Sequence, residues 1–167
     1  MILQQLPNTS HVHADDPGEP STGVPRLSVA QDETPILTAF AAWRRVLEIG
    51  TGLGVSTRAL ASHATSVTTV DVDSWVHETI WPTLPDNVTC VADIDTVEPG
   101  FDLVFIDGDH SPDATERDVR TAMRLAPGGL ILVHDHNYAG PIEGLHRVAS
   151  DWSYVRTTHG LAWRFAS

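Results

Sequence analysis

The chain has 167 residues, 41% of them hydrophobic and 19% charged, which is the composition of one folded domain. No apolar run approaches the ~18 residues that a membrane-spanning helix needs, and the first residues lack the basic start of a signal peptide. The 22 acidic residues outnumber 10 basic ones, all of them Arg, so the net charge of −12 repels phosphate backbones and argues against a nucleic-acid partner. The lone Cys90 cannot form an internal disulfide, which fits a cytoplasmic protein.

Residues 1–30 are rich in proline, glycine and polar side chains, and this composition predicts an irregular N-terminal arm. The remaining residues, 31–167, form the predicted domain. Its first element is a helix around 32–43, where Ile36, Leu37 and Phe40 recur at helical spacing.

Strands and helices then alternate along the chain. We expect strands at 45–49, 67–70, 88–91, 102–106 and 130–133, and helices at 55–63, 75–81, 112–126 and 142–150. Ser111 is a typical N-cap and Pro112 suits the first helical position. Two strand-like runs around His159 and Gly160 predict a closing antiparallel hairpin. The predicted fold class is α/β, a mostly parallel sheet with helices on both faces and that hairpin at its C-terminal end.

Each of the five expected parallel strands is followed by a glycine-rich or polar cluster. Ligands of such sheets bind beyond the carboxyl ends of the strands, so these clusters mark the expected site. They are Gly50-Thr51-Gly52-Leu53-Gly54, Asp71, Asp93, Asp107-Gly108-Asp109-His110 and His134-Asp135-His136-Asn137.

The segment VLEIGTGLGVSTRAL (46–60) predicts a strand, a glycine turn and a helix. Its third glycine, Gly54, comes one residue earlier than in the dinucleotide-binding pattern, and Val55 occupies the usual place. The E-x-G-x-G-x-G pattern that begins at Glu48 resembles class I methyltransferases that use S-adenosylmethionine (SAM). The stretch FDLVFIDGDHSPDATERDVRTAMRLAPGGLILVHDHN (101–137) resembles small-molecule O-methyltransferases, both the catechol type and bacterial relatives with D-G-D-H.

This resemblance implies SAM as the cofactor and a Rossmann-like fold. It assigns Asp71 to the ribose hydroxyls and Asp93 to the neighbourhood of the adenine, although Asp71 could instead cap the next helix and Asp93 could be a solvated loop residue. The full set of implied cofactor-binding residues is Glu48, Gly50, Thr51, Gly52, Gly54, Asp71, Val72, Asp93 and Asp107.

Two aspartates at the ends of presumed neighbouring strands, Asp107 and Asp135, repel each other unless a cation or a proton lies between them. A divalent cation, Mg²⁺ by preference, would fit between them, although Asp107 could simply order its loop. In the catechol-type enzymes that the chain resembles, an asparagine after the second aspartate is the third ligand. Here His136 takes that position and Asn137 follows one residue later, and a histidine ligand would favour a softer ion such as Mn²⁺, Fe²⁺ or Zn²⁺.

Catechol-type enzymes have a lysine as general base three residues after the first aspartate. Here His110 takes that position, so the expected catalytic residues are His110 and Asp107. For His134 we expect a buried structural role.

The predicted function is SAM-dependent methylation of a small-molecule hydroxyl or phenol, with a metal ion as a further possibility. Loops, the N-terminal arm or the partner subunit of a homodimer would hold the acceptor. The alternatives are a protein that binds SAM without catalysis, another group-transfer enzyme such as an aminopropyltransferase, and an NAD-dependent oxidoreductase. We expect neither a nucleic-acid partner nor a membrane partner.

Overall fold

The computed structural model describes residues 29–166, so the expected N-terminal arm, residues 1–30, lies outside the described residues except for its last two. The strands are β1 (Arg45–Ile49), β2 (Ser66–Val70), β3 (Val88–Val91), β4 (Leu103–Ile106), β5 (Leu130–His134), β6 (Ser153–Val155) and β7 (Leu161–Phe165). The helices are α1 (Thr34–Ala41), α2 (Val55–Ala61), α3 (Ser74–Thr79), α4 (Pro112–Leu125) and α5 (Ala139–Val148), with short 3₁₀ turns η1 (Trp81–Thr83) and η2 (Ile94–Thr96).

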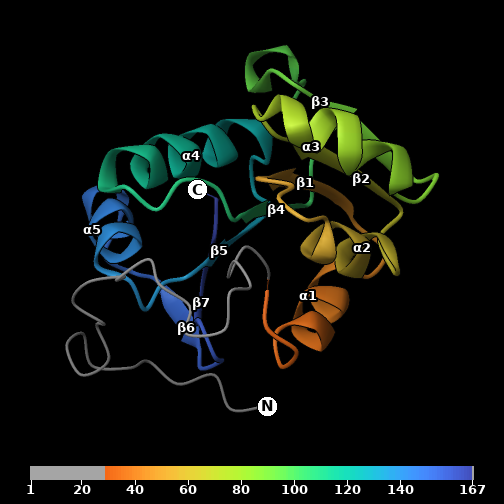
Figure 1. Cartoon of the computed structure of the whole chain (residues 1–167). Helices are drawn as coiled ribbons and strands as arrows, with labels where there is room; N and C mark the ends of the chain where they lie inside the picture. Colours follow the sequence, from red (N-terminus) through yellow and green to blue (C-terminus); the bar gives the residue numbers. More distant parts are fainter. Residues whose placement is uncertain (1–28, 167) are drawn as a thin grey trace, which may run out of the picture.

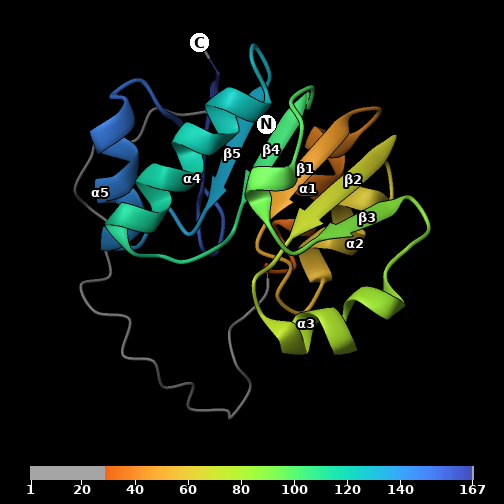
Figure 2. The same ribbon diagram turned by 90° about the horizontal axis from the view of Figure 1, so that it is seen from above.

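In the described residues all strands join one sheet in the order β3-β2-β1-β4-β5-β7-β6. The first five strands pair in parallel, while β7 pairs antiparallel with both β5 and β6. Figure 2 shows the parallel strands side by side, with their carboxyl ends toward the same edge. The expected fold class, a mostly parallel sheet closed by an antiparallel hairpin, is confirmed.

Helices cover both faces of the sheet, with α1 and α2 on one side and α4 and α5 on the other (Figure 1). Neighbouring residues of a strand point to opposite faces of the sheet. Val46 therefore belongs to the core on the side of α1 and α2, with Leu37 and Leu60. Leu47 belongs to the core on the side of α4 and α5, with Val119 and Leu145. All residues of β4 and β5 are buried. This is why both strands are almost continuously apolar and why they can support a site only at their ends.

Side chains cap the starts of α4 and α3, and the cap of α4 is the expected one. The Ser111 hydroxyl accepts a hydrogen bond from the Ala114 N–H, and Pro112 is the first residue of α4. The Asp73 carboxylate caps α3 by accepting from the Trp75 N–H. None of the helices in residues 29–166 is long and apolar enough to cross a membrane.

Several helix boundaries differ from the expectation by one to three residues. The helix expected at 142–150 begins three residues earlier, at Ala139, because Pro141 lies in the first turn, where no N–H is needed from it. The helix expected at 75–81 is α3, which ends at Thr79 before the separate 3₁₀ turn of Trp81–Thr83.

Candidate active site

The strand order reverses at β1, which pairs with β2 on one side and with β4 on the other, and open parallel sheets bind their ligands at such a point. The glycine turn after β1 and the acidic loop after β4 touch there. The Asp107 N–H donates to the Ile49 carbonyl oxygen at 2.9 Å. A side-chain carbon at Gly50 would overlap the Asp107 carbonyl oxygen, and Gly50 has φ +96°, so both packing and backbone conformation require glycine.

The carboxylate of Asp71 organises the glycine turn. Its Oδ2 accepts hydrogen bonds from the N–H groups of Thr51 at 2.9 Å and Gly52 at 3.1 Å, and its Oδ1 accepts from the Asp73 N–H at 2.9 Å. A carboxylate can accept about four hydrogen bonds, so one acceptor position remains for a ligand hydroxyl. Asp71 does not cap α3, a role that Asp73 fills.

Glu48 is fully buried beneath the glycine turn. Its Oε2 accepts hydrogen bonds from the hydroxyls of Thr57 at 2.6 Å and Thr69 at 2.7 Å, while Oε1 has no hydrogen-bond partner. Burial raises the pKa of Glu48 to about 7. From this position Glu48 ties α2 and β2 to the turn, and its buried side chain offers no surface to a ligand.

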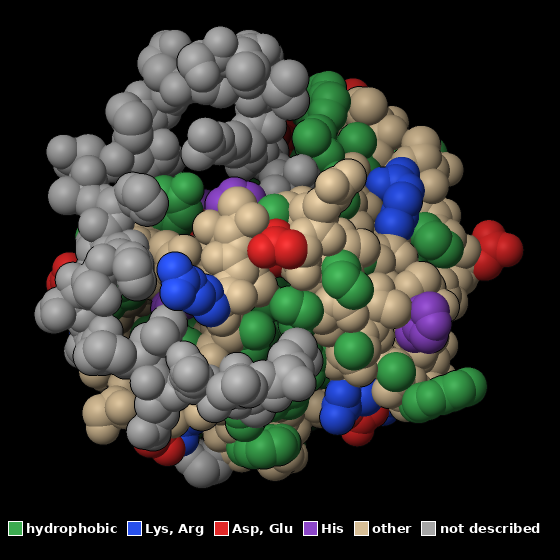
Figure 3. Space-filling view, turned by 90° about the horizontal axis from the view of Figure 1, so that it is seen from below, with side chains coloured by type: hydrophobic (Ala, Val, Ile, Leu, Met, Phe, Trp, Pro, Cys, Tyr) green, Lys and Arg blue, Asp and Glu red, His purple; other side chains and the backbone are tan. Residues whose placement is uncertain are grey.

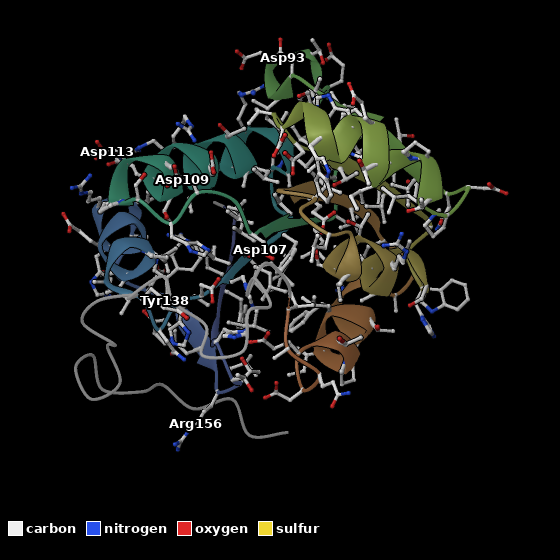
Figure 4. The ribbon with its side chains drawn as sticks, viewed as in Figure 1. Asp93, Asp107, Asp109, Asp113, Tyr138 and Arg156 are labelled. Carbon is white, nitrogen blue, oxygen red and sulfur yellow. The ribbon has the colours of Figure 1, made fainter. Side chains whose placement is uncertain are left out.

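Two further residues expected at the cofactor lie on the surface. Val72 is 88% exposed directly after Asp71. Asp93 is exposed and accepts a hydrogen bond from the Asp95 N–H at the start of η2. Figure 4 shows Asp93 at the margin of the molecule, well away from Asp107. The loop role that the sequence left open for Asp93 therefore has a structural basis.

His134, at the end of β5, lies at the centre of a cluster of three carboxylates, those of Glu33, Asp107 and Asp135. Its Nδ1 lies 2.9 Å from Asp107 Oδ1 and 3.1 Å from Asp135 Oδ2, and its Nε2 lies 2.9 Å from Glu33 Oε2. The expectation that Asp107 and Asp135 come close is confirmed, because β4 and β5 are neighbours. The group that lies between them in this structure is the His134 ring, whose Nδ1 contacts both carboxylates.

His110 completes this cluster from the loop before α4. Its Nε2 lies 2.9 Å from Asp135 Oδ2, and its ring stacks on Tyr138 with centroids 5.9 Å apart. Asp107, His110 and Asp135 together offer ligand atoms that all lie within 4.8 Å of one another. Their two carboxylates suit a hard divalent cation.

His136 lies apart from this group, so the geometry brings His110, rather than His136, to the two aspartates. Its ring stacks on Tyr154 at 4.7 Å and packs against Gly160, where a side-chain carbon would overlap its Nδ1. Burial lowers the pKa of His136 to about 4. Asp135 has φ +55°, a left-handed conformation that ends the alternation of the strand and redirects the residue that follows.

Glu33 and His159 are residues of the cluster that sequence reasoning missed. Glu33 immediately precedes α1 and is fully buried. Its Oε2 lies 3.2 Å from His159 Nδ1, and its Oε1 accepts from the Thr157 hydroxyl at 2.7 Å and the His159 N–H at 3.0 Å. Neither residue belongs to a motif, and only the folded chain brings the start of α1 to the β6–β7 turn.

The electrostatics of the cluster follow from these contacts. Burial alone would lower the pKa of His134, but its hydrogen bonds to Asp107, Asp135 and Glu33 outweigh burial and raise that pKa to about 12. For Asp135 and Glu33 burial would raise the pKa, but the histidines hold both carboxyls well below their usual range. The hydrogen bond to Asp135 raises the pKa of His110 above its ordinary value.

A family model described as a methyltransferase domain matches residues 47–136, from the middle of β1 to the end of this cluster. The chain belongs to this methyltransferase-domain family. A comparison with curated proteins finds no significant match.

Solved structures of methyltransferases share the fold. A tRNA methyltransferase from Aquifex aeolicus is 19% identical with a TM-score of 0.64, over 89% of this chain and 72% of that one. A DhpI–SAH complex is 22% identical with a TM-score of 0.57, over 77% of this chain and 78% of that one. The N-methyltransferase NodS from Bradyrhizobium japonicum is 19% identical with a TM-score of 0.57, over 81% of this chain and 93% of that one. The family match over residues 47–136 and these shared folds agree, and both place the chain among proteins with a methyltransferase domain.

Proposed function

We propose that this methyltransferase transfers the methyl group of SAM to a hydroxyl of a small molecule, a phenol or similar compound, with His110 as general base. The observation that carries the proposal is the pairing of His110 Nε2 with Asp135 Oδ2 at 2.9 Å. This pair lies on the same strand edge as the glycine turn, which touches Asp107.

The residues at the glycine turn fit SAM. Asp71 has an acceptor position left for a ribose hydroxyl, and it already holds the Thr51 and Gly52 backbone in the turn. SAM supplies an electrophilic methyl group on its sulfonium, so the protein has to orient the acceptor and remove its proton. Glu48 supports the turn from below through Thr57 and Thr69.

His110 can remove that proton because only one of its ring nitrogens, Nε2, is engaged with Asp135. In the neutral ring, Nε2–H donates to Asp135, and Nδ1 keeps a lone pair for the acceptor hydroxyl. The side chain of His110 is 46% exposed, so an acceptor can reach it, and the stacked ring of Tyr138 limits its rotation. Asp135 in turn is oriented by His134, whose Nδ1 contacts the same carboxylate oxygen, Oδ2, at 3.1 Å.

A divalent cation such as Mg²⁺ is the second part of this proposal. Asp107 and Asp135 would hold it with their carboxylate oxygens, and its charge would lower the pKa of the acceptor hydroxyl. It would share those oxygens with the Nδ1–H of His134, so we expect weak rather than tight binding. The proposal that His110 removes the proton does not depend on the cation.

Charge supports a small molecule over RNA as the acceptor, although RNA methyltransferases share the fold. The net charge of −12 repels phosphates, and on the described part of the face in Figure 3 the basic side chains stand apart from one another. The His110–Asp135 pair favours a catalyst over a protein that only binds SAM. Cytoplasmic location and a homodimer stay predictions.

The test is methyl transfer from labelled SAM to a panel of phenols and other hydroxyl compounds. We expect transfer to at least one of them and a kcat ~10²–10⁴-fold lower for His110→Gln, because a general base contributes about that much. Affinity for S-adenosylhomocysteine should be unchanged in this variant. The exposed His146 on α5 provides the control, since His146→Gln should keep kcat. Transfer to RNA alone, or a His110→Gln variant that keeps more than about a tenth of kcat, would overturn the proposal.

A further inference from the structure

A second cluster of metal-binding side chains lies on the far side of His134 from Asp107. Its ligand atoms are Glu33 Oε2, His134 Nε2 and His159 Nδ1, and all of them lie within 4.8 Å of one another. Glu33 Oε2 is 2.9 Å from His134 Nε2 and 3.2 Å from His159 Nδ1. Metal bonds of about 2.0–2.2 Å keep neighbouring ligand atoms roughly 3–3.4 Å apart, so the 3.2 Å spacing matches ligands of one ion and the 2.9 Å spacing needs only a small widening.

The surroundings of His134 match those of a metal-bound histidine. A ligating histidine almost always donates its other ring N–H to a carboxylate or carbonyl, which sets the ring orientation. His134 Nδ1 does this, because it lies 2.9 Å from Asp107 Oδ1 and 3.1 Å from Asp135 Oδ2. This leaves Nε2, the nitrogen that faces Glu33, as the one to ligate an ion. The contact to the two aspartates is independent of Glu33 and His159.

Burial and rigidity also favour an ion here. The side chains of Glu33 and His134 are 0% and 3% exposed, and that of His159 is 16% exposed. The second oxygen of Glu33 is held by the Thr157 hydroxyl and the His159 N–H, so the carboxylate has a defined orientation. The nearby carboxylates of Asp107 and Asp135 add negative charge that attracts a cation.

We propose that Glu33, His134 and His159 form a site for a divalent transition ion of the zinc class. Two imidazoles and one carboxylate suit Zn²⁺ or Co²⁺ better than Mg²⁺, which prefers oxygen ligands. When the ion binds, the protons on His134 Nε2 and His159 Nδ1 leave to solvent, and the two freed lone pairs form the bonds to the ion. His159 then carries its ring proton on Nε2. The Nδ1–H stays on Asp107 and Asp135. The ion therefore joins the start of α1, the end of β5 and the β6–β7 turn.

This site does not depend on the proposed methyl acceptor, and its test needs neither SAM nor turnover. The tag-free chain, stripped of metal, is titrated with Co²⁺, whose visible absorption reports coordination. We expect saturable binding of one ion per chain. His159→Asn removes a ligand of this site alone and should weaken binding by at least about 100-fold, more than the loss of a residue that only hydrogen-bonds to a ligand. His110→Asn, which alters only the other cluster, should keep the affinity within about threefold.

Zn²⁺ gives a second readout through thermal unfolding. It should raise the Tm of the wild type and of His110→Asn, but not that of His159→Asn. Far-UV circular dichroism checks that each variant folds, and Glu33→Gln replaces His159→Asn if the latter does not. Absent Co²⁺ absorption, or an equal loss of binding in His110→Asn, would overturn the proposal. In the first case the cluster is a hydrogen-bonded network only, and in the second the ion lies at the aspartates.

Discussion

The side chains of Glu33 and His134 meet at 2.9 Å although 101 positions separate them in the chain. The contact joins the residue before α1 to the last residue of β5, and both side chains are buried. Because His134 also contacts Asp107 and Asp135, it links the start of α1 to the residues proposed for catalysis. A substitution of Glu33 should therefore alter the position or charge of the residues proposed for catalysis, although Glu33 is not proposed to contact the substrate.

Stability should reveal this contact directly. In the metal-free protein, Glu33→Gln leaves the His134 charge without one partner, at a cost of about 3–5 kcal/mol in the free energy of unfolding. The Glu33 carboxylate stabilises the fold above its ordinary pKa of 4.5 and loses this effect at lower pH. His134 contributes fully below its ordinary pKa of 6.5 and progressively less as the pH rises toward about 12.

The gap between wild type and Glu33→Gln should therefore be largest between pH 4.5 and 6.5 and smaller near pH 10. Urea unfolding at these pH values measures it. The neighbouring Asp32 is exposed and bonds Thr158, so Asp32→Asn should cost less than about 1 kcal/mol. Equal stability of Glu33→Gln and wild type at about pH 5.5 would contradict the buried ion pair.

Asp71 should control affinity for the cofactor. Asp71→Ala removes the acceptor for a ribose hydroxyl and releases the N–H groups of Thr51 and Gly52, so Kd for S-adenosylhomocysteine should rise about 10- to 100-fold. Calorimetry measures the change. Asp73→Asn keeps the cap of α3, since asparagine caps as well as aspartate, and should leave Kd unchanged. An unaltered Kd in folded Asp71→Ala would refute the cofactor assignment.

The pH profile should report the His110–Asp135 pair. Since the hydrogen bond to Asp135 raises the pKa of His110, and the neutral ring is the base, kcat/KM should increase with pH through a pKa above 6.5 and then flatten. Asp135→Asn removes the charge that raises this pKa, so the rising limb should shift to lower pH. A profile unchanged by Asp135→Asn would show that another group titrates.

Dependence on Mg²⁺ tests the cation part of the proposed function separately. After chelation, Mg²⁺ should raise kcat for the wild type, and Asp107→Asn should remove this response by taking away a carboxylate ligand. Asp109, which is exposed and bonds the Ser111 N–H, provides the control, since Asp109→Asn should keep the response. Turnover that is insensitive to Mg²⁺ would eliminate the cation and leave His134 as the charge between the aspartates.

Gly160 should be required for the position of His136. Gly160→Ala places a side-chain carbon into the His136 ring and also strains a backbone at φ +82°, which alone costs about 1–3 kcal/mol. Gly128 has a similar φ of +75° with open space around it, so Gly128→Ala carries only the strain. Thermal unfolding should show Gly160→Ala as the less stable of the two. Equal Tm values would mean that the His136 ring moves freely aside.

Patterns close together in the chain predicted much of this molecule. The apolar runs at 45–49 and 130–133 are strands, Ser111 and Pro112 begin α4, and the resemblance to methyltransferases agrees with the family match. Asp107 and Asp135 were expected to meet because each ends a strand of one parallel sheet. These features depend on hydrogen bonds and side-chain periods within a few residues, which a sequence displays directly.

The sequence by itself thus determined the sheet, its glycine turn and the edge of the sheet at which the polar clusters gather. Only the tertiary structure decided which histidine contacts which carboxylate. Glu33 and His159 are 126 positions apart and belong to no motif, so no local sequence pattern predicts their contact. The left-handed φ of +55° at Asp135 turns His136 away and leaves the aspartates to His110 and His134. Such pairings depend on packing between distant segments and on the charge that each buried group meets there, and neither exists before the chain folds.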